Sequence, residues 1–153
     1  MVRWLDEQEQ QTWSAFIRLR QRLDAAMAAG LARDGLSVPD YEVLVALSAA
    51  PDGQLRARDL GAQICWDKSR LSKHLARMDA RGLVRRSPAA DDARGRLVCL
   101  TEAGRRALEH AAPHHVDLVR RLFVDRLSDA EAAVVRSLAA KVTDEIERDT
   151  GLV

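Results

Sequence analysis

Apolar and polar positions between residues 55 and 101 predict two short helices followed by a β-hairpin. The first helix is expected from about Arg58 to Cys65. The second ends at Gly82, and its inner stripe follows the i, i+4, i+7 spacing of an α-helix: Leu71, Leu75 and Met78. Two apolar runs then flank a charged loop, SPAADDARG, in which Gly95 is expected to permit a tight tip. A helix, a turn, a second helix and a hairpin are the outline of a winged helix-turn-helix.

The segments on either side predict longer amphipathic helices. Four are expected, at residues 7–29 with Gly30 as the stop, 39–48, 101–125 capped by Thr101, and after a capping box of Ser128 and Glu131. The predicted fold class is therefore mostly α with a small β-hairpin wing (α+β), in the order α-α-α-α-β-β-α-α. We divide the chain into an N-terminal dimerisation helix (1–34), a winged helix-turn-helix DNA-binding lobe (35–100) and C-terminal dimerisation helices (101–153).

The outer face of the second short helix has the composition that insertion into the major groove of DNA requires. Asp67 or Ser69 can cap this helix. At about 100° per residue, small and hydrogen-bonding side chains alternate with cations on the face opposite the inner stripe. The candidate DNA-contacting residues there are Ser69, Arg70, Ser72, Lys73 and Arg77. The sequence has no glutamate between Gly61 and Ala93, whereas an ordinary exposed helix face often carries one.

The hairpin supplies a second set of candidate DNA contacts. Arginine is attracted to a narrow minor groove, which a wing tip can reach. The candidates are Arg85, Arg86, Arg94, Gly95 and Arg96. Asp92 would repel phosphate unless it orients an arginine, so we interpret it as the partner of Arg94.

Charge is concentrated in this central region. The whole chain has 24 Lys+Arg and 23 Asp+Glu, but residues 54–96 have 11 basic and 5 acidic side chains, a net charge of +6. The remainder carries −5. A local basic surface favours phosphate contacts over general stickiness. The N-terminus lacks an apolar signal region, no apolar run approaches the ~18 residues of a membrane span, and two cysteines are too few for a disulfide framework, so we expect a cytoplasmic protein.

The terminal helices have apolar stripes wider than a small winged domain can cover. They could pack on each other within the chain, but a two-fold DNA reader needs its recognition helices about 34–36 Å apart, which favours a dimer interface. The candidate dimerisation residues are Trp13, Phe16, Ile17, Leu23, Val135, Leu138, Val142 and Ile146.

Sequence motifs in the wing and after it resemble the multiple antibiotic resistance regulator (MarR) family. The motifs are GLVRR, D-A-R-G, V-C-L-T and E-A-G-R, with Ala93 where the family usually has an arginine. The similarity covers almost the whole chain. It implies a homodimeric transcription regulator, usually a repressor, that binds a pseudo-palindromic operator. It also implies release by a small, often aromatic or anionic, ligand bound between the dimer helices and the DNA-binding lobe.

Two histidines, His110 and His114, stand at an i, i+4 spacing that could share a metal ion, with Glu109 beside them. A zinc-sensing branch of the family has a similar helix placement. Against a metal site, Pro113 is expected to disrupt the helix, and Glu42 is the one plausible distant ligand. We therefore predict no metal and no cofactor, and keep a metal-responsive regulator as an alternative.

Other reactive side chains have simpler explanations. Cys65 and Cys99 are expected to be buried packing residues, and His74 to be a core histidine or the wall of an effector cleft. No catalytic triad, carboxylate pair or phosphate-binding loop is present, so an enzyme is not predicted. A second functional class remains open, a helical dimeric interaction protein with a degenerate winged domain.

Overall fold

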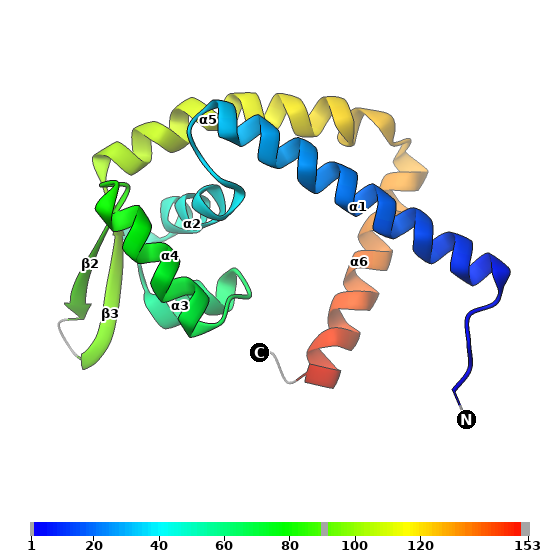
Figure 1. Ribbon diagram of the computed structural model, residues 1–153, viewed down its shortest axis with the longest axis horizontal. Helices are drawn as coiled ribbons and strands as arrows, with labels where there is room; N and C mark the ends of the chain where they lie inside the picture. The colour runs from blue at the N-terminus through cyan, green and yellow to red at the C-terminus, as the bar shows by residue number, and fades with distance from the viewer. Residues whose placement is uncertain (1, 90–91, 151–153) are drawn as a thin grey trace.

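The computed structural model describes residues 2–89 and 92–150, except for the side chains of residues 88, 89, 92–95 and 150. The helices are α1 (Glu7–Arg33), α2 (Val38–Ala49), α3 (Ala57–Gln63), α4 (Lys68–Ala80), α5 (Glu102–Leu122) and α6 (Asp129–Thr150). The described residues also form two 3₁₀ turns, η1 (Pro51–Gly53) and η2 (Val124–Arg126). The strands are β1 (Gln54–Arg56), β2 (Val84–Ala89) and β3 (Asp92–Leu100). Figure 1 shows α1 and α5 along one side, with the elements from α2 to β3 gathered beneath one end of α5 and α6 turning away at the other.

The fold class is confirmed, with one strand more than the sequence predicted. The chain is mostly helical, and its small antiparallel sheet has the strand order β1-β3-β2. The unpredicted strand, β1, pairs with the wing, Leu55 opposite Val98. Three residues are too short for a periodic signal, so only the pairing partner reveals this strand.

The predicted end of the first helix was wrong. Gly30 lies inside α1, which continues to Arg33. A Cβ on Gly30 would be 2.6 Å from a methyl group of Leu118, so this glycine allows α1 to approach α5 closely. The residue that stops the helix is instead Gly35, which lies two positions after Arg33 and has a φ of +76°. The amides of Gly35 and Leu36 close the turn on the carbonyls of Ala32 and Leu31.

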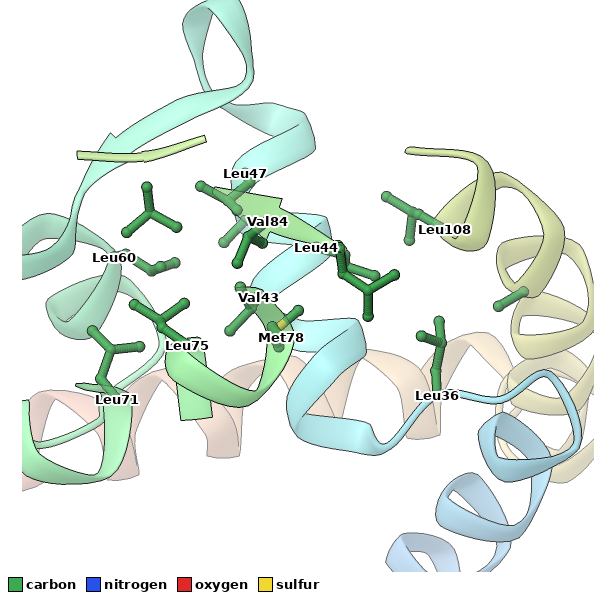
Figure 2. Packing of buried hydrophobic residues seen from close by; sticks show 14 of the residues in the cluster. Leu36, Val43, Leu44, Leu47, Leu60, Leu71, Leu75, Met78, Val84 and Leu108 are labelled. Carbon is green, nitrogen blue, oxygen red and sulfur yellow. The ribbon is translucent and has the colours of Figure 1, made fainter. Parts of the chain in front are cut away.

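A single core joins the end of α1, helices α2, α3 and α4, the sheet and the first half of α5. Helix α2 is its centre: Val43, Leu44 and Leu47 are fully buried, after a capping box of Ser37 and Asp40. The predicted inner stripe of α4 is confirmed. Figure 2 shows Leu75 and Met78 near Val43 of α2, and Leu71 on the side of Leu60 of α3. Burying each such side chain stabilises the fold by about 1.5–3 kcal/mol. The buried aliphatic residues of this core are Leu31, Leu36, Val43, Leu44, Leu47, Leu60, Leu71, Leu75, Met78, Leu83, Val84, Val98 and Leu108.

The junction between the wing and α5 depends on Thr101 and Gly104. The Thr101 hydroxyl caps α5 by accepting from the Gly104 amide, as predicted, and it also lies 2.6 Å from the Gly82 carbonyl oxygen. A Cβ on Gly104 would be only 2.0 Å from the Leu83 carbonyl oxygen, so the close approach of α5 to β2 requires glycine here. Helix α5 then ends at Leu122, three residues before the predicted end.

Helix α6 is separate from this core. Its capping box, Ser128 with Glu131, is confirmed by a 2.8 Å bond from the Ser128 amide to the Glu131 carboxylate. None of the described α6 side chains is buried. Across the described residues, none of the helices is long and apolar enough to cross a membrane.

Candidate nucleic-acid interface

The outer face of α4 is exposed over its whole length. Asp67 caps the helix by accepting from the Arg70 amide at 2.9 Å, which decides between the two predicted caps. The exposed residues are Ser69, Arg70, Ser72, Lys73, Ala76 and Arg77. They comprise three cations and small or hydroxyl side chains, with no carboxylate among them. The face can therefore approach a phosphate backbone closely.

The turn before α4 is held in a strained conformation. Cys65 has a φ of +55°, a left-handed conformation that usually selects glycine, because the Trp66 amide bonds back to the Gly61 carbonyl at 2.9 Å. Cys65 is exposed, so the prediction that it is a buried packing residue was wrong. Cys99 is partly buried, with its sulfur 3.6 Å from the Gln54 side-chain oxygen.

The indole of Trp66 orients one of the candidate DNA contacts. The guanidinium carbon of Arg70 lies 3.9 Å from the ring centroid, a cation–π contact. Such contacts contribute about 0.5–1 kcal/mol at an exposed site. Arg70 is therefore ordered before any partner binds, which the sequence analysis did not foresee.

His74 lies on the buried side of α4 and contacts a second candidate DNA-binding residue, Arg77. Its Nδ1 accepts a 2.9 Å hydrogen bond from the Arg77 guanidinium, and its Nε2 lies 3.0 Å from Asp40 Oδ1 without hydrogen-bond alignment. Burial lowers the pKa of His74, the Asp40 charge opposes that shift, and Arg77 adds to it. The imidazole is thus neutral at neutral pH and leaves Nδ1 able to accept. This confirms the interpretation of His74 as a core histidine.

Arg81 connects the end of α4 to Asp40 of α2 and to the turn that follows α1, a link that the sequence analysis missed. Arg81, the C-terminal cap of α4, donates to Asp40 Oδ2 at 2.8 Å and to the Gly35 carbonyl at 2.8 Å. Burial raises the pKa of Asp40, but the Ser37 amide and the Arg81 guanidinium outweigh burial and hold it below its usual value. The Ser37-x-x-Asp40 spacing was a detectable capping signal; nothing local marks Arg81 as its partner.

The wing differs in part from its prediction. Arg85 and Arg96 are exposed, whereas Arg86 pairs with Asp79 of α4 at 3.1 Å and braces the wing against that helix. Gly95 was expected at the tip, but it lies within β3. There the pairing jumps from Pro88 opposite Arg96 to Ala89 opposite Asp92. The side chains of Asp92 and Arg94 lie outside the described part of the structure, so their predicted pairing stays a prediction.

The predicted dimerisation residues are only partly covered within one chain. Phe16, Leu138, Val142 and Ile146 are each about half exposed, Val135 is 38% exposed, and Ile17 and Leu23 are partly buried. Trp13 is 56% exposed and makes a tilted ring contact with Phe16, with ring centroids 5.8 Å apart.

A polar cluster lies where α1 ends against α5. Asp34 contacts both predicted histidines, with its Oδ1 3.0 Å from His114 Nδ1 and 3.5 Å from His110 Nε2. The carboxylate in the cluster is therefore Asp34, and not Glu42 or Glu109 as the sequence suggested. Helix α5 runs unbroken through Pro113, so the expected disruption of the helix was also wrong.

A cavity of about 390 Å³ opens beside this cluster. It is lined by Gly30, Arg33, Asp34, His114, His115, Asp117, Leu118 and Arg121. It therefore lies between the first helix and α5, at the edge of the lobe. His74 is not among its lining residues, so the alternative of a pocket wall does not apply to it in this cavity.

Comparison with known proteins agrees with this geometry. Residues 34–95 match the family model described as "MarR family". The transcriptional regulator HosA of Escherichia coli is 37% identical over 107 residues, which cover 70% of this chain and 77% of HosA. The chain belongs to the MarR family of transcriptional regulators.

Solved structures extend the likeness to the whole fold. AbsC, a MarR family regulator from Streptomyces coelicolor, superposes with a TM-score of 0.92 at 34% identity, covering 95% of this chain and 99% of AbsC. Sco3205 from the same organism, solved in complex with DNA, gives a TM-score of 0.93 at 32% identity, covering 96% and 92% of the two chains.

Proposed function

We propose that this protein binds a pseudo-palindromic DNA operator as a homodimer and acts as a ligand-released repressor in the cytoplasm. Residues 35–100 read the DNA, and residues 1–34 and 101–153 assemble the dimer. The observation that carries the proposal is the outer face of α4, exposed and free of carboxylates, on a fold that superposes on a relative solved with DNA.

Contacts inside the lobe support distinct roles for the cations of this face. Lys73 lies at the centre of the exposed face. Arg70 and Arg77 are held in fixed directions by Trp66 and His74. Ordering a long side chain in advance reduces the entropy lost on binding, which suits hydrogen bonds to base edges. We assign phosphate or base contacts in the wing to Arg85, Arg94 and Arg96, and a bracing role to Arg86.

Exposed apolar side chains support the homodimer. Trp13 and Phe16 on α1 and Leu138, Val142 and Ile146 on α6 remain open to water in one chain. Burial of such surface yields about 25 cal/mol per Å². A two-fold partner would cover both stripes and set the spacing of the two α4 helices at about one turn of DNA.

The cavity between α1 and α5 supports release by a ligand. Its volume of about 390 Å³ lies in the range of small-molecule sites. Its lining holds Arg33 and Arg121 together with Asp34 and Asp117, so it offers charged partners of both signs to a polar ligand. A ligand bound there shifts the spacing of the recognition helices if it prefers one arrangement of α1 and α5 over another.

A binding experiment tests the proposal. Duplexes that bind the purified protein are selected from a random pool, and their affinity is measured by fluorescence anisotropy against scrambled duplexes at two salt concentrations. We expect a preference for the selected duplex and a steep loss of affinity with salt. Lys73→Ala and Arg94→Ala should each weaken binding by about 1–3 kcal/mol with an unchanged melting temperature.

Lys141→Ala provides the matched control, because it removes the same side chain from an exposed position on α6. Its affinity should equal that of the wild type. Equal affinity for selected and scrambled duplexes, or no effect of Lys73→Ala, would instead favour the protein-interaction alternative.

A further inference from the structure

The cluster of Asp34, His110 and His114 has a geometry that neither DNA contact nor dimerisation explains. Asp34 caps the end of α1, while the two histidines lie one turn apart on α5. One candidate ligand atom from each residue lies within 4.8 Å of the others. Residues 80 positions apart in the chain therefore converge on one point.

The distances match those around a small transition-metal ion. Zinc binds imidazole nitrogen and carboxylate oxygen at about 2.0–2.2 Å, which places neighbouring ligand atoms of a tetrahedral site roughly 3.3–3.5 Å apart. The Asp34 carboxylate oxygen lies 3.0 Å from His114 Nδ1 and 3.5 Å from His110 Nε2. The two imidazole nitrogens also lie within 4.8 Å of each other, so side-chain rotation can bring all three ligand atoms onto one ion.

The environment of the cluster favours an exchangeable ion over a structural one. The Asp34 side chain is 9% exposed, which holds its carboxylate in place, whereas the side chains of His110 and His114 are more than 60% exposed. Ions can therefore enter from solvent. The adjacent cavity leaves room for water at a fourth position.

We propose that Asp34, His110 and His114 form a binding site for a divalent transition-metal ion, with Zn²⁺ as the best match. Two imidazoles and one carboxylate suit zinc or a neighbouring first-row ion, and do not suit Mg²⁺ or Ca²⁺, which take oxygen ligands. The ion joins the end of α1 to α5.

Occupancy of this metal site is coupled to α4, the proposed recognition helix, through Gly35, the residue after Asp34. Gly35 follows Asp34, and its carbonyl oxygen accepts a 2.8 Å hydrogen bond from Arg81, the cap of α4. An ion that fixes Asp34 thus fixes the point at which α4 contacts α1. This regulatory step rests on the proposed DNA-binding function, whereas the metal site itself does not.

The test is a zinc titration of the full-length protein, free of any affinity tag, in competition with a chromogenic chelator. We expect the wild type to take up one Zn²⁺ per chain. Zinc affinity should fall at least tenfold in each of three ligand variants, Asp34→Asn, His110→Gln and His114→Gln. Loss of a residue that merely supports a metal ligand typically lowers metal affinity ~10–100-fold, so loss of a ligand itself should do at least as much. Co²⁺ should produce the visible absorption bands of a tetrahedral site. Glu109→Gln is the matched control, because it alters a neighbouring α5 side chain outside the cluster, and it should bind as the wild type does.

Failure to compete with the chelator, or equal zinc affinity in all three ligand variants, would overturn the metal site. The regulatory step is tested separately by measuring affinity for a selected duplex with and without Zn²⁺. An affinity that changes in the wild type but not in His114→Gln supports coupling, and an unchanged affinity in the wild type overturns it. A protein that binds zinc but no DNA would contradict the proposed function while leaving the metal site intact.

Discussion

The winged lobe and the two helical arms of this chain handle their apolar residues in opposite ways. In the lobe, taken here as residues 36–100, most of the large aliphatic side chains of α2 and α4 point into one core, and Val43, Leu44, Leu47 and Met78 are fully buried. In the arms, taken as residues 7–27 and 129–149, none of the described residues is buried. Large apolar side chains are present in both regions, so composition does not separate them.

This contrast shows which part of the fold is complete in one chain. The lobe satisfies its own packing and can present α4 as a rigid surface. The arms have amphipathic helices whose large apolar side chains stay about half exposed in one chain, and an exposed apolar patch of this kind marks an interaction site. Stability of the lobe and assembly of the arms should therefore respond to different substitutions.

The largest expected effect is a loss of lobe stability in Leu75→Ala. Leu75 is 2% exposed, and truncation of such a core leucine costs about 2–5 kcal/mol through lost contacts and the cavity left behind. Urea unfolding followed by Trp66 fluorescence, in a background with Trp4 and Trp13 changed to Phe, reports on the lobe alone. Val134→Ala on α6, 65% exposed, is the control and should change the free energy of unfolding by less than about 0.5 kcal/mol. Similar effects of the two changes would remove the distinction between lobe and arm.

The next effect concerns assembly. Leu138→Glu combined with Val142→Glu places charges on the exposed apolar side of α6, so self-association should weaken at least 100-fold, or about 2.7 kcal/mol. Sedimentation velocity measures it, and the Trp66 unfolding midpoint should stay unchanged. Lys141→Glu on the same helix alters charge without removing apolar surface and should leave the dimer intact. A wild-type protein that sediments as a 17.0 kDa monomer at micromolar concentration would contradict the dimer.

A smaller effect is expected from the strained turn inside the lobe. Cys65→Gly should raise the free energy of unfolding by about 1 kcal/mol, because glycine adopts the +55° φ without the cost that a Cβ imposes. Cys65→Ala keeps the Cβ and should give no gain. An equal gain in both variants would show that the thiol, and not the backbone conformation, limits stability.

The smallest effect is a dependence of lobe stability on pH. The pKa of His74 is lowered in the folded protein, chiefly by burial, so the unfolded chain takes up this proton first, near its ordinary value of about 6.5. Stability is therefore fully present above about pH 6.5 and falls as pH decreases below it. His74→Gln should flatten the slope of unfolding free energy between pH 7.5 and 5.5. His115, whose pKa burial also lowers, retains its own contribution in that variant. An unchanged slope would assign the dependence to other groups.

Local patterns in the sequence determined the elements, and with them the class of protein. The stripe of Leu71, Leu75 and Met78 specified which side of α4 is buried, and therefore which cations are exposed. The caps at Thr101 and Ser128 were identified because each signal lies within four residues of the backbone it satisfies. Such features need no knowledge of distant neighbours.

Tertiary structure alone decided the contacts between elements that are far apart in the sequence. Gly30 was predicted to end the helix because the neighbouring sequence does not show its contact with Leu118 of α5. Cys65 was predicted to be buried because the sequence does not show that it occupies the left-handed position of an exposed turn. Asp34 meets His114 only after α1 and α5 have packed, and Asp40 meets Arg81 only after α2 and α4 have packed. Periodicity reports which side of an element is apolar, whereas the partner of a polar side chain depends on how those elements are placed in space. The sequence by itself thus determined a winged helix-turn-helix with a basic recognition face, and the packing of the helices decided what orients that face and what can bind beside it.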